Sequence, residues 1–349
     1  MIGAMVLLLA LSFAALYGIG VSLEVPSLSL LRRQVMFSVI GLLAMVVSFS
    51  VPVQRWRQYA LPLYGFGAAL LAAVLIFGQT RRGTTGWFAV GPLSFQPVEI
   101  AKILLLVMLA YLVDRRPAHG LRSPQFLALG GLATSGYAVL SLLQPDFGSA
   151  ALLALLWVAV LALVGIPTRQ TLLLAGAVLV IALVGWNFVL QDYQRGRVIA
   201  FLNPGADPYG RGYQVRQAII AVGAGRMFGR GLGFGSQSQL KFLPAAQTDF
   251  IFAVIAEELG FIGVTLILLS YLVVLHRLLA LAQRCSDDFS ATFAYGVSVL
   301  IFSQVTINIG MNLGLLPVTG VGLPLLSYGG SYLLATFILL GVVQRIAVS

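Results

Sequence analysis

One carboxylate, Asp249, stands where a polar, glycine-rich and basic stretch ends and a long apolar segment begins, in KFLPAAQTDFIFAVIAEELGFIG at residues 241–263. Only 11 of the 349 residues are acidic, and three of them, Asp249, Glu257 and Glu258, fall in this segment. A carboxylate at the mouth of an apolar helix is costly to keep unless another group pairs with it or a reaction uses it. The placement predicts a functional site around Asp249 at a membrane surface. The structural alternative is a helix N-terminal carboxylate that matches the helix dipole.

Three more ionisable residues stand at the starts of other apolar runs. Glu99 and Lys102 lie three residues apart in FQPVEIAK, so a helix would place them on one face. Asp146 follows Pro145 in QPDFGSA. We expect all three groups on the same side of the membrane as Asp249. The structural alternatives are a buried ion pair that fixes helix packing for Glu99 and Lys102, and a helix N-cap for Asp146.

Glu257 and Glu258 follow Asp249 by eight and nine residues. At the rise of an α-helix they are expected roughly 12–14 Å deeper in the membrane than Asp249. Structural pairing is therefore favoured over a catalytic role for both.

The composition is that of a polytopic membrane protein. The chain is 59% hydrophobic and 9% charged, with a mean hydropathy of +0.98. Its apolar runs are continuous for about 20 residues, which indicates helices rather than the alternating pattern of a β-barrel. We predict an all-α fold in one integral membrane domain, 1–349, with ten transmembrane helices. The predicted spans are 2–22, 33–51, 59–78, 97–113, 124–143, 147–164, 168–190, 250–279, 290–312 and 331–348.

The distribution of charge predicts the orientation. With the N-terminus inside, the short inner loops hold nine arginines and the short outer loops hold four, which favours cytoplasmic termini and an outward-facing site. The outer loop 191–248 is an exception, because it carries seven basic and two acidic residues. Lipid headgroups or a phosphorylated substrate would balance that charge. Charges scattered among spans argue against nucleic-acid binding, and the single cysteine, Cys285, excludes an intrachain disulfide.

Two stretches are rich in glycine. The glycines between Gly223 and Gly235 permit either a phosphate-binding backbone turn or close packing, with a short amphipathic helix expected just before them at 213–222. The run 308–331 holds so many glycines and prolines that it cannot form one unbroken helix. Irregular backbone at membrane depth lines a cavity or is buried in protein, so this run is expected to form a wall of the site. Ser327 and Tyr328 would supply hydroxyls there.

Five motifs together carry a resemblance to a known family. They are FQPVEIAK at 95–102, QPDFGSA at 144–150, NPGADPYGRGYQ at 203–214, FLPAAQTDFIFAVIAEELG at 242–260 and LLPVTGVGLPLLSYGGS at 315–331. Over essentially its whole length the chain resembles the SEDS family of bacterial cell-wall polymerases, the RodA and FtsW proteins. PVTG at 317–320 and NPGADP resemble the RodA branch, which acts in cell elongation.

The resemblance implies an activity, a substrate and a partner. It implies a peptidoglycan glycosyltransferase in the bacterial cytoplasmic membrane that polymerises lipid II, the undecaprenyl-pyrophosphoryl disaccharide-pentapeptide. It also implies a class B penicillin-binding protein as transpeptidase partner. The family's functional positions fall on Glu99, Lys102, Asp146 and Asp249. The chain departs from the family's usual pattern at 245–247, where it reads Ala-Ala-Gln, at Gly86 in place of arginine, and at Tyr332 after SYGGS.

Glycan extension has a sugar hydroxyl attack an anomeric carbon that carries diphosphate. Because diphosphate leaves as a stabilised anion, one carboxylate base and a set of cations suffice. We assign Asp249 as the base. Lys102 and the loop arginines Arg195, Arg197 and Arg216 would stabilise the diphosphate, and Ser327 would contact substrate. Glu99 and Asp146 would orient Lys102 or help hold a divalent cation, Mg²⁺ or Mn²⁺, and no organic cofactor is expected.

Two other classes of function fit parts of the sequence. A flippase for the lipid-linked precursor would also have intramembrane charges and broken helices, although the chain shows no repeat symmetry. A non-catalytic scaffold for a transpeptidase is the other alternative.

Overall fold

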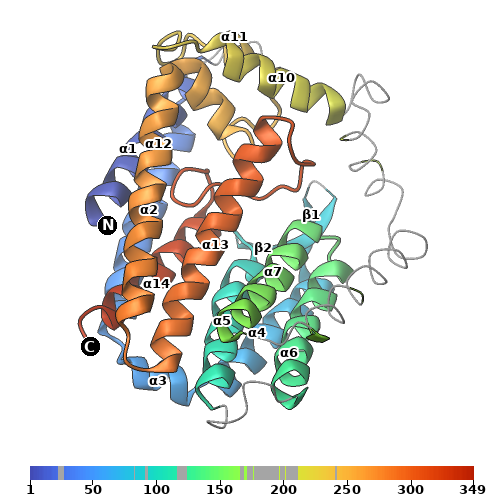
Figure 1. Ribbon diagram of the computed structural model, residues 1–349. Helices are drawn as coiled ribbons and strands as arrows, with labels where there is room; N and C mark the ends of the chain where they lie inside the picture. The colour runs from blue at the N-terminus through green and yellow to red at the C-terminus, as the bar shows by residue number, and fades with distance from the viewer. Residues whose placement is uncertain are drawn as a thin grey trace.

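The structure is a computed structural model that describes residues 1–22, 27–81, 83–90, 93–115, 124–165, 169–170, 176, 196, 201, 211–239 and 242–349. Helices dominate it (Figure 1), which confirms the predicted fold class. The helices are α1 (Ile2–Val21), α2 (Ser29–Ser50), α3 (Val53–Gln58), α4 (Ala60–Phe77), α5 (Pro97–Asp114), α6 (Pro124–Leu143), α7 (Phe147–Val164), α10 (Arg211–Ala224), α11 (Ser236–Gln239), α12 (Ile251–Arg284), α13 (Asp288–Asn312) and α14 (Gly330–Ile346).

A helix occurs at each of the nine predicted spans that fall in this part of the chain, while the seventh, 168–190, and most of the loop 191–210 lie outside it. Among the described residues, six helices are long and apolar enough to cross a membrane: α1, α2, α4, α7, α12 and α13. Two shorter apolar helices, Leu127–Leu143 within α6 and Gly330–Ile346, accompany them. Length and apolar composition therefore located the helices correctly.

Helix α5 lies at the centre of the bundle. Every residue from Pro97 to Ala110 except Ile100 is buried, and α5 packs against α4, α6, α7, α13 and α14. Neighbouring helices thus surround α5. The charged pair that α5 carries is therefore placed in the interior of the protein.

Small residues let the outer helices approach closely. A Cβ atom on Gly341 of α14 would lie 2.1 Å from Ser48 Oγ and 2.5 Å from the Met45 carbonyl of α2. The hydrophobic effect does not drive helices together within lipid. Close backbone packing of this kind therefore stabilises the contact between α2 and α14.

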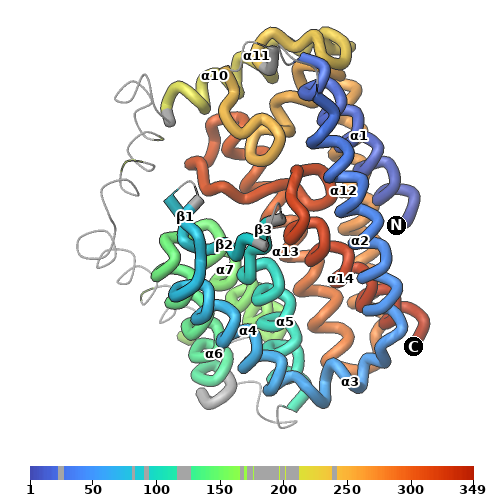
Figure 2. The backbone as a smooth tube through the Cα atoms, turned by 180° about the vertical axis from the view of Figure 1, so that it is seen from behind, coloured from blue at the N-terminus to red at the C-terminus, as the bar shows by residue number. Residues whose placement is uncertain are grey.

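A small antiparallel sheet was not anticipated from the sequence. Strands β1 (Gln79–Arg81), β2 (Thr84–Val90) and β3 (Leu93–Phe95) pair in the order β1-β2-β3 between α4 and α5 (Figure 2). The Thr85 amide donates to the Gln144 carbonyl at 3.2 Å, which ties the sheet to the turn before Asp146. The connection between α4 and α5 is thus a folded element next to Asp146.

The predicted span 250–279 is wrong in one important respect, because α12 is two helices. Gly260 has φ 64° and ψ −159°, which breaks the helix into 251–259 and 261–284. The second part is about 36 Å long, enough to cross a membrane. The first part is buried from Ile251 to Glu258. Buried irregular backbone of this kind is tolerated at membrane depth.

The two parts of α12 run in opposite directions along α1. Near the middle of α1, Ser12 Oγ donates to the Leu326 carbonyl, and the adjacent Ser327 Oγ donates to the Thr248 carbonyl, both at 2.7 Å. Near the end of α1, the Glu258 carboxylate lies against Gly18. The chain from 248 to 258 therefore follows α1 away from Met1.

The second part then returns, because Met1 and Cys285 line the same cavity. Glu258 is consequently farther along α1 toward the α10 end than Asp249, and the expected depth order of these carboxylates is reversed. A hydropathy pattern carries no information on this direction.

The glycine-rich stretch packs against the break in α12. The amides of Arg230 and Gly231 donate to the carbonyls of Glu257 and Glu258 at 2.9 and 3.0 Å. A Cβ atom on Gly229 would lie 2.1 Å from the Glu258 carbonyl oxygen. Close packing, one of the two roles the sequence allowed, thus explains this glycine. The expected helix at 213–222 is present as α10.

Glu257 has a structural place in the same contact. Its fully buried carboxylate accepts hydrogen bonds from the Ser236 hydroxyl and the Gln237 amide, both at 3.1 Å. Arg230 Nη1 donates to Ser236 Oγ at 2.9 Å. These contacts are those of a structural carboxylate, as the sequence favoured.

Candidate active site

Asp249 lies in a run of turns that enters the first half of α12, and it is held by its backbone. Its carbonyl oxygen accepts hydrogen bonds from Asn308 Nδ2 at 3.1 Å and Asn312 Nδ2 at 3.0 Å. Asn312 Oδ1 also accepts from the Ala253 amide at 3.3 Å. These contacts fix the main chain at Asp249 and do not involve its side chain. That side chain is half-buried and is positioned by the fixed backbone.

The sequence analysis missed both asparagines. Each is fully buried on α13, and Asn308 Nδ2 also donates to the Val321 carbonyl at 2.7 Å. The signal was present, since two asparagines four residues apart in an apolar helix share one face. They were overlooked because they stand at the edge of the glycine-rich run, which we treated as broken backbone from residue 308.

Ser327, the predicted substrate contact, bridges two backbone segments. Its hydroxyl donates to the Thr248 carbonyl at 2.7 Å and accepts from the Leu323 amide at 2.8 Å. The Tyr328 amide donates to the Gln247 carbonyl at 2.9 Å. The segment between α13 and α14 therefore lies beside the Asp249 turn, as expected of a wall of the site.

Glu99 and Lys102 form a buried ion pair. Lys102 Nζ donates to Glu99 Oε1 at 2.8 Å, and the two residues are 3% and 6% exposed. On its other side Nζ faces the Tyr332 ring, 5.5 Å from the centroid. An ammonium has three N–H donors, and among the described residues Glu99 is its only hydrogen-bond acceptor. The lysine keeps capacity to bind an anion.

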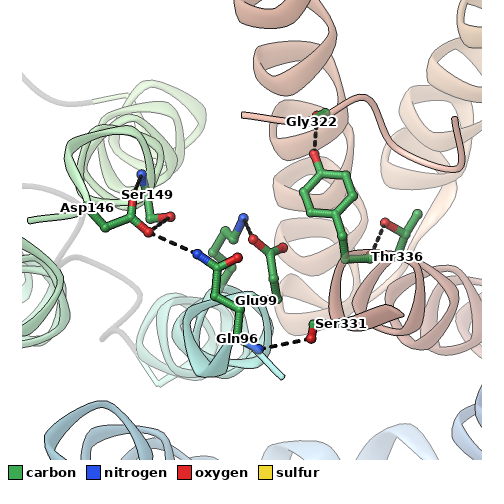
Figure 3. A network of polar contacts seen from close by, with 9 residues as sticks. Gln96, Glu99, Asp146, Ser149, Gly322, Ser331 and Thr336 are labelled. Carbon is green, nitrogen blue, oxygen red and sulfur yellow. Dashed lines mark hydrogen bonds and ion pairs between the residues drawn. The ribbon is translucent and has the colours of Figure 1, made fainter. Parts of the chain in front are cut away.

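Tyr332 links this pair to the wall. Its hydroxyl donates to the Gly322 carbonyl, next to Val321, whose carbonyl accepts from Asn308. The dashed line at Gly322 in Figure 3 marks this hydrogen bond. The departure from the family's usual serine thus connects Lys102 to the segment that also holds Asp249.

Asp146 is an N-cap, the structural alternative considered for it. Its carboxylate accepts from the Ser149 amide at 3.0 Å and the Ser149 hydroxyl at 2.8 Å. It also accepts from Gln96 Nε2 at 3.2 Å, which joins the starts of α7 and α5 (Figure 3). With three hydrogen bonds accepted, Asp146 is suited to position the neighbouring helices.

The segment 313–329 brings these groups to one region. Through Ser327 this segment contacts the Asp249 turn. Through its contact with Tyr332 it lies near Lys102. At the start of α7, a Cβ atom on Gly148 would lie 2.7 Å from the Thr319 carbonyl. Glu99, Lys102, Asp146 and Asp249 thus all lie on elements that adjoin this segment, and their roles in a reaction stay a prediction.

The predicted basic residues are less fully placed. Arg195 and Arg197 lie outside the described residues. Arg216 is exposed on α10, which packs against α12 and α13. No group of three metal-ligating side chains (His, Cys, Asp, Glu) that could hold an ion occurs in the described ranges. A divalent ion held by one or two of these carboxylates would take its other oxygen ligands from water or substrate.

Comparison with known proteins gives a consistent result. The model of the FtsW, RodA and SpoVE family, described as cell cycle protein, matches residues 1–349. The chain is 40% identical to peptidoglycan glycosyltransferase MrdB of Escherichia coli over 324 residues, 91% of this chain and 86% of the relative. It is 36% identical to a probable peptidoglycan glycosyltransferase FtsW of Hydrogenovibrio crunogenus, covering 99% of this chain and 90% of that one.

Solved structures agree in fold. One chain, from work on "Structural coordination of polymerization and crosslinking by a peptidoglycan synthase complex", has a TM-score of 0.82 and 36% identity, with 99% of this chain and 97% of that one covered. The crystal structure of the rod shape determining protein RodA of Thermus thermophilus has a TM-score of 0.74 and 32% identity, with 99% and 94% covered. This chain belongs to the FtsW, RodA and SpoVE family.

Proposed function

We propose that this chain is a peptidoglycan glycosyltransferase that extends glycan strands from lipid II during cell elongation. The observation that carries the proposal is the buried Lys102, whose ammonium has Glu99 as its one hydrogen-bond acceptor among the described residues and lies beside the segment that holds Asp249. A buried cation and a positioned carboxylate are the two groups that this transfer needs. The 40% identity to a peptidoglycan glycosyltransferase supports the same activity.

The proposed step is a single displacement with inversion at the anomeric carbon. The acceptor 4-hydroxyl forms a new C–O bond as the bond to the diphosphate oxygen breaks. The hydroxyl proton passes to the Asp249 carboxylate, and undecaprenyl diphosphate leaves with the electron pair. No general acid is needed, because diphosphate is already a stable anion.

Lys102 is proposed to neutralise charge on the leaving diphosphate. Its pairing with Glu99 holds the ammonium in place, and Tyr332 limits its movement on the other side. Arg195, Arg197 and Arg216 of the outer loop are proposed to attract the same diphosphate. Asp146 is assigned a positioning role through Gln96.

A divalent cation, Mg²⁺ or Mn²⁺, is kept as part of the proposal. Magnesium in phosphoryl sites is commonly held by one or two carboxylates together with substrate phosphates. Glu99, Asp146 and Asp249 are the carboxylates available for that purpose, and no step above is assigned to the ion.

Activity on purified substrate separates this proposal from a flippase and from a scaffold. The purified chain in detergent, given lipid II, is expected to form glycan strands and release undecaprenyl diphosphate. The assay should be run alone and with a class B penicillin-binding protein, the proposed partner, whose transpeptidase site is blocked. Absence of glycan in both arms, with lipid II transport in vesicles, would support the flippase. Absence of both activities would support the scaffold.

The outward-facing site is tested through Cys285. Both termini and Cys285 lie at one end of the molecule, since Met1, Cys285 and Ser349 line a common cavity. If that end is cytoplasmic, a membrane-impermeant thiol reagent should leave Cys285 unlabelled in spheroplasts and label it after the membrane is opened.

Burial and, second, Asp287 raise the pKa of the Cys285 thiol, so labelling should be done near pH 8.5. The control is Cys285→Ser with Ser286→Cys, which moves the thiol to an exposed neighbour. Labelling of either variant from outside would invert the topology and place the proposed site on the wrong face.

A further inference from the structure

A cavity of about 890 Å³ lies at the end of the molecule that holds both termini, away from the candidate active site. It forms where the start of α1, the end of α12 and the end of α14 meet. Its lining residues include Ile2, Ala280, Leu281, Val343 and Ile346 on the apolar side. None of the residues assigned to the transfer reaction lines it. Its occupant is therefore a question separate from the proposed function.

The polar side of the cavity is rich in hydrogen-bond donors. Arg277 and Arg284 lie seven residues apart on α12, so both side chains project from one face, beside His276. Gln344 Nε2 is buried and has no hydrogen-bond partner in the described part of the chain. That nitrogen has almost no accessible surface, so it lies behind the lining, and the donors that reach the cavity are those of the two arginines.

The acceptors in the lining are few. Asp287 is the one lining residue with a carboxylate side chain, and its Oδ1 already accepts from the Ser290 amide as the N-cap of α13. The two guanidinium groups thus outnumber the one carboxylate side chain in the lining. The balance favours an anion, and planar guanidinium groups match the geometry of phosphate oxygens.

The surroundings indicate that the anion is carried on a lipid. Ile2, which lines the cavity, is 60% exposed, and Val348, between two lining residues, is 71% exposed. In a bilayer such side chains at the end of membrane helices contact acyl chains. A cavity that is apolar on one side and basic on the other fits an amphiphile with a phosphate headgroup.

We propose that this cavity binds the headgroup of an anionic phospholipid, with Arg277 and Arg284 as its phosphate contacts. The simpler role for arginines at helix ends is topological, by the excess of positive charge on the cytoplasmic side. That role requires no cavity and no preference among lipids, so the two can be separated by experiment.

Cys285 provides the measurement, because it lines the cavity and is the only cysteine in the chain. The full-length protein in uncharged detergent is labelled with an uncharged maleimide at pH 8.5. Rates are compared with no additive, with phosphatidylglycerol, with phosphatidylcholine, and with glycerol 3-phosphate at the same concentration as the lipids. We expect phosphatidylglycerol to slow labelling by about tenfold, as 90% occupancy would, and the other two additives to slow it less than twofold.

Two matched variants test which residues bind. Arg277→Gln with Arg284→Gln should lose the protection, and native mass spectrometry should show one fewer bound phosphatidylglycerol. Arg32→Gln with Arg33→Gln removes the same charge from exposed positions on α2 that do not line the cavity, and should retain both signals. Thermal melting of both variants confirms that each is folded.

Three results would overturn the proposal. Equal protection by phosphatidylcholine would show an apolar site with no phosphate recognition. Equal protection by glycerol 3-phosphate would show a site for a soluble phosphate. Retained protection in the Arg277→Gln, Arg284→Gln variant would leave these arginines with only a topological role. None of these results depends on glycosyltransferase activity, so failure here and failure of the proposed function are distinguishable.

Discussion

Asp249→Asn is expected to abolish glycan polymerisation while leaving the protein folded. The amide has nearly the shape of the carboxylate but cannot take the proton from the acceptor hydroxyl. Loss of a general base costs about 10² to 10⁴-fold in rate. The fold should persist, because Asn308 and Asn312 bind the backbone carbonyl of residue 249 rather than its side chain. Strand formation from lipid II, measured beside thermal melting, checks both halves of the expectation.

Two variants sharpen this test. Asp249→Glu keeps a carboxylate but moves it by one methylene, so it should retain part of the activity. Asp288→Asn removes a carboxylate from an exposed position at the far end of α13 and should leave the rate unchanged. Near-normal product from Asp249→Asn would remove Asp249 from the role of base and leave the positive end of the half-helix, or a substrate-bound ion, to assist the acceptor.

The membrane makes part of this structure easy to predict. A spanning helix must satisfy its own backbone in lipid, so each appears in the sequence as an apolar run of about 20 residues. For the same reason an ionisable group within such a run is conspicuous. Glu99, Lys102, Asp146 and Asp249 were found in this way, and the structure gathers them around the segment 313–329.

The reversal of chain direction at Gly260 could not be predicted in the same way. Residues 250–279 form one predominantly apolar run, and its hydropathy is unchanged whether the helix continues or turns back. The evidence for the break is a long-range contact: a Cβ atom on Gly260 would lie 2.3 Å from the Gly229 amide nitrogen. A glycine at 260 becomes informative only when the loop that packs on it is known.

The reversal also changes the picture of the site. A continuous helix would have placed Asp249 at the rim, with Glu257 below it. In the structure the half-helix 251–259 enters the protein with its N-terminal end inward, so Asp249 lies in the interior at the level of Ser12 and Ser327. The segment that holds Asp249 there also adjoins the buried Lys102 through Tyr332. The Glu257 end is fastened by Ser236 and Gln237 at the α10 end.

Lys102→Ala is expected to lower polymerisation by about 10² to 10³-fold, the usual cost of removing one donor that stabilises a developing anion. Lys102→Arg should recover only part of this, because a planar fork does not reproduce a point charge held between Glu99 and the Tyr332 ring. Removing the lysine alone also leaves Glu99 buried without its partner, which typically costs about 3–5 kcal/mol of stability. A loss of activity in Lys102→Ala therefore has two explanations, catalytic and structural.

The double variant Glu99→Gln with Lys102→Met separates them. It removes both charges and keeps similar volumes, so a pair that served only packing would be replaced at little cost in folding. We expect this variant to melt near the parent temperature and yet to make no glycan, since the diphosphate has lost its buried cation. Kinetics on lipid II and thermal melting, measured on the same preparation, distinguish the catalytic from the structural explanation. A folded and fully active double variant would assign Lys102 to helix packing and transfer charge stabilisation to the arginines of the outer loop.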